Sequence, residues 1–279
     1  MTPDLGRYGI WKRFDAATPE LARELEDLGF GTLWIGGSPS GDLDVVERAL
    51  DATSSLMIAT GIVNIWKDDA ATVAASFHRI DARHPGRFVL GIGTGHREQF
   101  GDRFTKPYSA LVEYLDGLDE HRVPADRRLL AALGPRVLAL AAERSLGAHP
   151  YLTTPAHTRL ARDLLGATAL LAPEHKVVLD ADPVRARSLG RPQVRTPYLG
   201  LANYTNNLRR LGYADADLAD GGSDRLIDDL VIHGDIAVVA ARLNEHLASG
   251  ADHVAIQLIS AEGADPVEGY RRLAGELLG

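Results

Sequence analysis

Residues 84–96 read HPGRFVLGIGTGH, and the fold can be worked out from this stretch. The run from Arg87 to Gly93 is apolar on both faces, which is typical of a parallel strand that is covered on both sides. Pro85 and Gly86 end a helical pattern that begins near Asp69. A helix that leads directly into a buried strand is the repeating unit of a parallel α/β fold.

Seven further β-rich segments alternate with helical patterns in the same way. They cover residues 7–11, 31–36, 56–65, 128–133, 148–152, 170–179 and 253–259. Strict alternation over 279 residues predicts a closed (β/α)8 TIM barrel of the α/β class, with an open doubly wound sheet as the alternative. The connection between the last two strands, about residues 180–251, is long and helical in pattern, and we interpret it as an insertion that covers the barrel mouth. No repeat or linker divides the chain, so we expect residues 1–279 to form one domain.

The composition excludes several classes of site and partner. The chain has 30 Lys and Arg residues against 38 Asp and Glu, a net charge of −8, which argues against a general nucleic-acid binder. It has no cysteine, so thiol catalysis, iron–sulfur clusters and thiolate zinc sites are excluded. The histidines lack the spacing of a metal site. No signal-peptide pattern opens the chain, and no apolar run approaches the roughly 18 residues that span a membrane. We therefore expect a cytoplasmic protein with no metal and no membrane or nucleic-acid partner.

The fourth strand ends in three alternating glycines and a histidine, at the end of the barrel where such enzymes place their active sites. Gly91, Gly93 and Gly95 allow a flat ring or a phosphate to approach the backbone, because no Cβ intervenes. The spacing is G-x-G-x-G with no helix directly after it, so it is not a dinucleotide-binding fingerprint. His96 at the loop tip is a candidate proton donor or ligand contact, because imidazole titrates near neutrality. A solvated loop histidine is the alternative.

Three other strand ends carry candidate residues. Gly61, among β-branched residues, indicates a bulge or a strained bond close to a ligand. The turn Gly134-Pro135-Arg136-Val137 opens a helix whose free N–H groups suit a phosphate, and an ordinary turn with a surface arginine is the alternative. His149 and Tyr151 lie at the end of the sixth strand and are expected to point into the barrel mouth.

Several of these segments, in this order, resemble the luciferase-like monooxygenase superfamily. Within it the chain is similar to the actinobacterial branch of coenzyme F420-dependent oxidoreductases. The resemblance is carried by residues 9–11 (GIW), 61–66 (GIVNIW), 84–93 (HPGRFVLGIG), 134–135 (GP), 147–151 (GAHPY), 171–174 (LAPE), 203–212 (NYTNNLRRLG), 222–226 (GSDRL) and 250–254 (GADHV).

The resemblance implies a luciferase-like barrel with an insertion before its last strand, binding a deazaflavin or flavin at the carboxyl ends of the strands. It implies a non-prolyl cis peptide at Gly61–Ile62 that backs the ring. It implies a homodimer as well. The cofactor contacts that it implies are Gly61, Ile62 and Asn64, then Gly93, Thr94, Gly95 and His96, and, at the phosphate, Gly134, Pro135, Arg136 and Val137.

One departure from the family pattern follows the second strand. Better-known deazaflavin dehydrogenases of the superfamily have an Asp-His pair there, whereas this chain has Gly36-Gly37-Ser38. A sugar-phosphate dehydrogenase is therefore not expected. His96 is then the first candidate for proton transfer and His149 the second.

The main functional hypothesis is an F420-dependent oxidoreductase that moves a hydride between the deazaflavin and a small organic substrate. One alternative is an FMN-dependent monooxygenase supplied by a separate reductase. Another is a non-catalytic protein that binds the deazaflavin. No motif in the insertion names the substrate.

Overall fold

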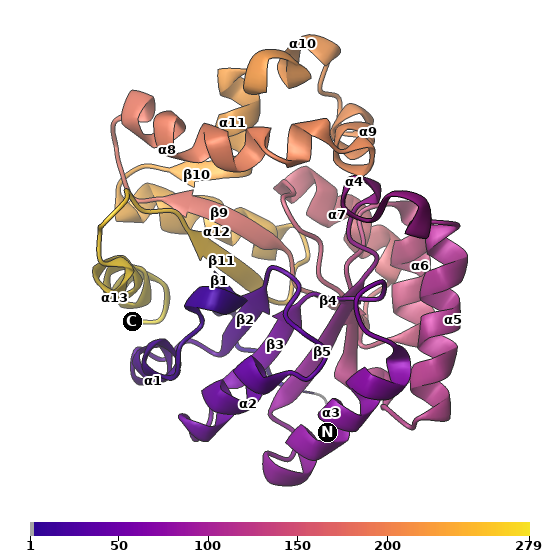
Figure 1. Ribbon diagram of the computed structural model, residues 1–279. Helices are drawn as coiled ribbons and strands as arrows, with labels where there is room; N and C mark the ends of the chain where they lie inside the picture. Colours follow the sequence, from indigo (N-terminus) through magenta and orange to yellow (C-terminus); the bar gives the residue numbers. More distant parts are fainter. Residues whose placement is uncertain (1–2) are drawn as a thin grey trace.

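The computed structural model describes the chain from residue 3 to residue 279, apart from the side chains at positions 99, 100 and 103. Parallel strands run through the middle of the molecule and helices surround them (Figure 1). The strands are β1 (Tyr8–Arg13), β2 (Thr32–Gly36), β3 (Met57–Gly61), β4 (Val63–Asn64), β5 (Phe88–Gly93), β6 (Arg128–Leu130), β7 (Gly147–Ala148), β8 (Leu170–Leu171), β9 (Glu174–Val178), β10 (Val231–His233) and β11 (Val254–Leu258).

The strands close into a ring through the segment that contains β8 and β9. The order along the sheet is β9-β11-β1-β2-β3-β5-β6-β7-β8, with β10 beside β9 and the short β4 beside β5. On one side of the segment the N–H of Ala172 donates to the carbonyl of Ala148 at 2.9 Å. On the other side the N–H of Ala255 donates to the carbonyl of Pro173, also at 2.9 Å. This closure confirms the predicted (β/α)8 barrel.

Helices on the outside of the barrel bury one apolar face against the strands. They are α1 (Pro19–Asp27), α2 (Asp44–Asp51), α3 (Ala70–Arg83), α5 (Pro107–Glu120), α6 (Pro135–Arg144), α7 (Pro155–Leu165), α12 (Ile236–Ala248) and α13 (Pro266–Leu277), with the short α4 (Arg97–Phe100) in the loop after β5. Side-chain caps begin several of them: Thr18 accepts from the N–H of Leu21, and Thr154 accepts from the N–H of His157. None of the helices in the described range is both long enough and apolar enough to cross a bilayer.

Most of the connection from β9 to α12 forms a layer above the strands (Figure 1), whereas its strand β10 pairs with β9 in the sheet. It contains α8 (Pro183–Arg195), α9 (Ala202–Arg210), α10 (Asp215–Leu218), α11 (Asp224–Leu230) and the strand β10. Its apolar side chains form their own cluster, which includes Val194, Tyr204 and Leu226. The strand β10 was not predicted from the sequence, and α12 packs against α7 and α13 of the outer ring. The covering segment is therefore shorter than the predicted 180–251.

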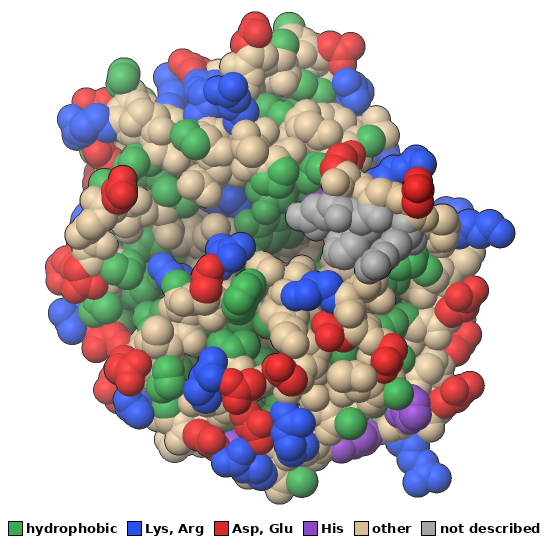
Figure 2. Space-filling model, viewed as in Figure 1, with side chains coloured by type: hydrophobic (Ala, Val, Ile, Leu, Met, Phe, Trp, Pro, Cys, Tyr) green, Lys and Arg blue, Asp and Glu red, His purple; other side chains and the backbone are tan. Residues whose placement is uncertain are grey.

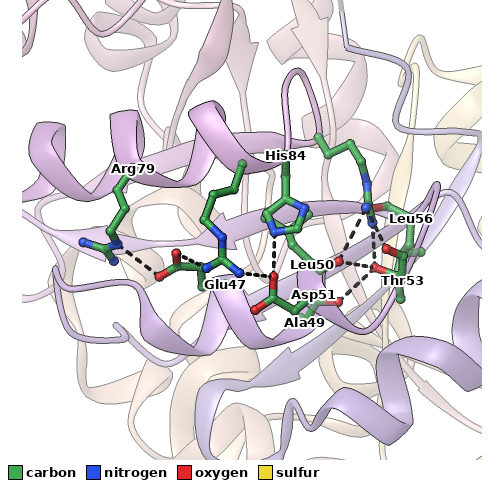
Figure 3. A network of polar contacts seen from close by, with 10 residues as sticks. Glu47, Ala49, Leu50, Asp51, Thr53, Leu56, Arg79 and His84 are labelled. Atoms are coloured by element: carbon green, nitrogen blue, oxygen red, sulfur yellow. Dashed lines mark hydrogen bonds and ion pairs between the residues drawn. The ribbon is translucent and has the colours of Figure 1, made fainter.

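A polar network joins α2 and α3 at the amino ends of β3 and β5 (Figure 3). Glu47 accepts from Arg79 and Arg83, and Asp51 pairs with Arg83 and His84. Next to them, the guanidinium of Arg87 donates to backbone carbonyls of the turn between α2 and β3. This end lies opposite the carboxyl ends of the strands, where barrel enzymes carry out their chemistry.

Candidate active site

A cavity of about 720 Å³ lies at the carboxyl ends of the strands, a size that is usual for small-molecule and cofactor sites. The barrel contributes Trp11, Gly61, His149, Lys176 and Gln257 to its lining, and the covering segment contributes Gln193, Tyr198 and Tyr204. In Figure 2, hydrophobic side chains gather in the hollow below the covering segment. The walls are therefore largely aromatic, with a few polar groups among them.

The structure brings most of the sequence-predicted residues to this one cavity. Those that line it are Gly61, Ile62, Thr94, Gly95, His96, Gly134, Val137 and His149. The peptide bond between Gly61 and Ile62 is cis.

Four other candidates do not line the cavity. Asn64 is buried and accepts from the N–H of Trp66. Pro135 and Arg136 are exposed, and the guanidinium of Arg136 lies 4.1 Å from the ring centre of Tyr108. A Cβ at Gly93 would lie 2.9 Å from the Cβ of Ala131, so packing inside the barrel accounts for this glycine. Of the three alternating glycines, only Gly95 reaches the cavity.

Two unpartnered polar atoms meet at the floor of the cavity, beside Gly61. A Cβ at Gly61 would lie 2.9 Å from Nε1 of Trp11 and 3.0 Å from Nε2 of His149. Both nitrogens are buried, and neither has a hydrogen-bond partner within residues 3–279. An unpaired buried polar atom costs about 1–3 kcal/mol, so such atoms call for a ligand or water. The glycine leaves room for one.

Hydrogen bonding decides which of the two nitrogens of His149 carries the proton. Its Nδ1 lies 2.6 Å from the carbonyl of Ala172, an acceptor, so Nδ1 is protonated and donates. Nε2 is then an unprotonated acceptor. Burial lowers the pKa of His149 to about 4, so the ring is neutral at pH 7. The ring stacks on Trp34 with centres 4.0 Å apart.

His96 lies higher, at the mouth of the cavity. It packs against Tyr198 and Tyr204 of the covering segment, with ring centres 6.3 and 5.5 Å away. Burial lowers the pKa of His96 below its ordinary value. Its Nδ1 is buried and has no hydrogen-bond partner among the described side chains and backbone.

Lys176, which sequence reasoning missed, lines another part of the wall and belongs to a buried ion pair. Lys176 is 1% exposed and Glu174 is 0% exposed, and Nζ lies 3.0 Å from Oε1. Nζ also lies 4.0 Å from the ring centre of Tyr151. Burial lowers the pKa of Lys176, and the charge of Glu174 opposes that shift. Two residues of opposite charge at alternate positions of a strand were the available signal, because alternate side chains of a strand share a face.

The amino end of α6 lies at another part of the wall. Gly134 is its N-cap residue, so no side chain satisfies the first N–H groups. A Cβ at Gly134 would lie 3.9 Å from Nη2 of Arg210. The helix dipole and this guanidinium both favour a negative group here. Among residues 3–279 no three acidic or histidine side chains are grouped so as to hold a metal ion.

Comparisons with known proteins agree with this architecture. Residues 15–121 match the family model described as luciferase-like monooxygenase. A search of curated proteins gave no match. An F420-dependent secondary alcohol dehydrogenase, solved with an F420–acetone adduct, is similar with a TM-score of 0.75 and 14% identity over 99% of both chains.

Two further solved structures have the same fold. The coenzyme F420-dependent tetrahydromethanopterin reductase of Methanopyrus kandleri has a TM-score of 0.69 and 19% identity over 98% of both chains. The oxygenating constituent of 3,6-diketocamphane monooxygenase from Pseudomonas putida, in complex with FMN, has a TM-score of 0.67 and 15% identity over 95% of this chain and 92% of that one. Residues 15–121 therefore match the family that the sequence resembles, and the chain shares the TIM-barrel fold of these solved structures.

Proposed function

We propose that the protein is an oxidoreductase that moves a hydride between coenzyme F420 and a small organic substrate. The observation that carries this proposal is the cavity itself. It joins the uncapped amino end of α6 to a floor with two unpartnered polar atoms, those of Trp11 and His149. One region suits a phosphate and the other suits a reacting group.

The residues present fit a deazaflavin. Gly61 and Ile62 would lie against its ring, Thr94, Gly95 and His96 would flank it, and Gly134 and Val137 would hold its phosphate with the helix dipole. When bound, the cofactor supplies hydride chemistry, and the protein supplies position and exclusion of water. The sequence resemblance favours F420, and two of the similar structures are described as F420-dependent. The similar monooxygenase in complex with FMN makes a flavin the alternative.

Trp11 and His149, at the floor of the cavity, would bind the substrate oxygen and accept the substrate proton. The indole N–H of Trp11 would donate to a substrate oxygen, and Nε2 of His149 would accept the proton of a hydroxyl group. His149 is neutral at pH 7 because burial lowers its pKa to about 4. Its Nε2 can therefore accept a proton, which is the direction of alcohol oxidation, and the lowered pKa makes it a weaker base than a free imidazole. His96, the first candidate from the sequence, becomes the second, because it packs against Tyr198 and Tyr204 of the covering segment.

The decisive experiment is titration of the protein with F420 and with FMN, followed by tryptophan fluorescence. Trp11 lines the cavity, so its emission should change as either cofactor enters. We expect tighter binding of F420. Tighter binding of FMN would favour the monooxygenase alternative, and binding of neither cofactor would overturn the proposal.

A charge at Gly134 tests where the phosphate binds. Gly134→Asp should weaken the binding of either cofactor about tenfold or more, because a carboxylate would face the phosphate. The protein itself should be no less stable, because aspartate is a favoured N-cap residue and Gly134 has ordinary extended backbone angles.

Gly275→Asp is the matched control, since Gly275 is exposed on α13 and no other atom lies near its Cβ position. It should leave both dissociation constants unchanged. Equal affinities of wild type and Gly134→Asp would show that the phosphate binds elsewhere.

A further inference from the structure

The orientation of one amide in the cavity wall can be assigned from its neighbours. Gln257 lies on β11, lines the cavity and is half-buried. Its Oε1 lies 2.8 Å from the hydroxyl of Tyr151 and 3.3 Å from Nζ of Lys176. The ammonium of a lysine can only donate, so the atom facing it must be an acceptor. The amide oxygen therefore faces Lys176, and the amide NH2 group faces away from it.

The ion pair behind Gln257 holds this arrangement in place. Glu174 accepts from Lys176 at 3.0 Å and from the backbone N–H of Leu152 at 2.9 Å. Lys176 is thereby tied to a buried carboxylate that is itself fixed by the backbone. Chains of hydrogen bonds polarise one another inside a protein. Donation to Oε1 by Lys176 and Tyr151 makes the N–H groups on Nε2 stronger donors.

No side chain or carbonyl in the described part of the chain accepts from Nε2 of Gln257 within hydrogen-bond distance, and this atom is not sealed off from the cavity. From this geometry we infer that Gln257 is a substrate-binding residue that recognises a neutral carbonyl oxygen, and that Lys176 is its positioning residue. This inference rests on the proposed function for placing the substrate in this cavity, and it deepens that proposal by naming a substrate class.

Charge and shape narrow the class to neutral, planar carbonyl compounds. The charge of Lys176 is already balanced by Glu174, so the part of the wall beside Gln257 offers no unpaired ammonium group to a carboxylate. The rings of Trp11, Tyr151 and Tyr198 lie near Gln257, with Trp11 and Tyr198 each within 5.5 Å of the Tyr151 ring centre. Aromatic walls favour flat, apolar partners. An aryl ketone, ester or amide satisfies both conditions.

The test compares two probes of nearly equal shape, acetophenone and ethylbenzene, which differ in the carbonyl oxygen. Each is titrated into the ¹⁵N-labelled protein without cofactor, and the side-chain amide signals of Gln257 are identified by their absence in Gln257→Leu. Acetophenone should bind about threefold to tenfold more tightly than ethylbenzene, the ratio that one ordinary hydrogen bond produces. Only acetophenone should shift the Gln257 amide signals strongly.

Variants separate this role from a structural one. Gln257→Leu and Gln257→Glu should both abolish the preference for acetophenone; the second keeps an acceptor for Lys176 and Tyr151, so the fold is retained. Gln193→Leu, the same change at another residue of the wall, should keep the preference. In the double variant Glu174→Gln/Lys176→Met the preference for acetophenone should fall, because the side-chain amide of Gln257 can then rotate and exchange the positions of its oxygen and its NH2 group.

Three results would overturn the inference. They are equal binding of the two probes, failure of acetophenone to bind, and a preference for acetophenone that survives in both Gln257 variants. None of these depends on F420 or FMN. Failure of the proposed cofactor binding would therefore be seen separately, in the cofactor titration.

Discussion

One ring nitrogen of His149 forms a hydrogen bond within the barrel, and the other faces the cavity, where it can contact a substrate. Nδ1 donates to the carbonyl of Ala172, whereas Nε2 is buried beside Gly61 with no partner in the described structure. The sequence placed this histidine at a strand end but could not say which nitrogen faced the cavity. That assignment needs the carbonyl of a residue 23 positions away along the chain.

The first residue-scale prediction separates these two nitrogens. His149→Asn keeps an N–H near the position of Nδ1 and removes the basic Nε2. We expect turnover to fall by about 10²–10⁴, the usual contribution of a positioned base, with cofactor affinity little changed. The measurement is oxidation of an alcohol with F420 as acceptor, followed by the absorbance of the deazaflavin. His78→Phe, at an exposed histidine on α3, is the control, and full turnover by His149→Asn would exclude this residue as the base.

At the scale of an element, β9 combines two roles in five residues. Val177 packs into the apolar layer between strands and helices, whereas Lys176 lines the cavity and Glu174 is buried as its partner. Buried charges are tolerated only when they are paired, because the desolvation of each is expensive. The two residues must therefore be considered together.

Breaking this pair should destabilise the protein more than removing it. Lys176→Met leaves Glu174 buried without its cation and should lower the free energy of unfolding by about 3–5 kcal/mol. Glu174→Gln/Lys176→Met should recover most of that loss, since no uncompensated charge remains. Urea unfolding of the three proteins measures this. A double variant that is as unstable as Lys176→Met would contradict the explanation.

The turn before β3 provides a second prediction at this scale, within the network of Figure 3. Arg87 donates at 2.8 Å to the carbonyl of Thr53 and at 2.9 Å to that of Leu56. Arg87→Met leaves these partly buried carbonyls without donors and should cost about 2–3 kcal/mol. Arg48→Met is the matched control, because Arg48 makes an exposed ion pair with Asp44 on the same helix that should contribute no more than about 1 kcal/mol. Equal losses from the two changes would show that the turn does not depend on Arg87.

At the scale of the whole molecule, buried neutral histidines couple stability to pH. Burial lowers the pKa of His149 and His253 to about 4 and that of His246 to about 3. In the unfolded chain each histidine returns to a pKa near 6.5. Between these values the unfolded state binds more protons than the folded state. Stability therefore rises with pH in this interval.

The expected result is a free energy of unfolding that is nearly constant above pH 6.5 and falls steadily as the pH is lowered toward 4. Each unit of pKa difference contributes about 1.4 kcal/mol. Urea unfolding at several pH values between 4.5 and 7.5 checks this, and replacement of His246 by Gln should reduce the slope. Stability that is independent of pH across this interval would show that the histidines are not buried in their neutral form.

Much of the architecture could be predicted because it depends on local patterns. The two-sided apolar run at 87–93 and the helix breaks before it are properties of neighbouring residues, and the strand pairing confirms the strand that they predicted. Caps such as Thr18 and Thr154 act on N–H groups three residues away, so they too can be read along the chain. The strand β10 was missed because it is only three residues long and pairs with β9 across the covering segment.

The sequence by itself determined the order of strands and helices, the barrel, and the end of the barrel at which candidate residues gather. Only the tertiary structure decided which atoms meet there: Nε1 of Trp11 beside Nε2 of His149, and the amide of Gln257 turned by Lys176. The reason is geometric. The interior of a barrel is filled by alternate side chains from strands far apart in the sequence, and their heights depend on the register of the strands around the ring. Periodicity along the chain shows that a residue points inward, whereas register decides what it touches.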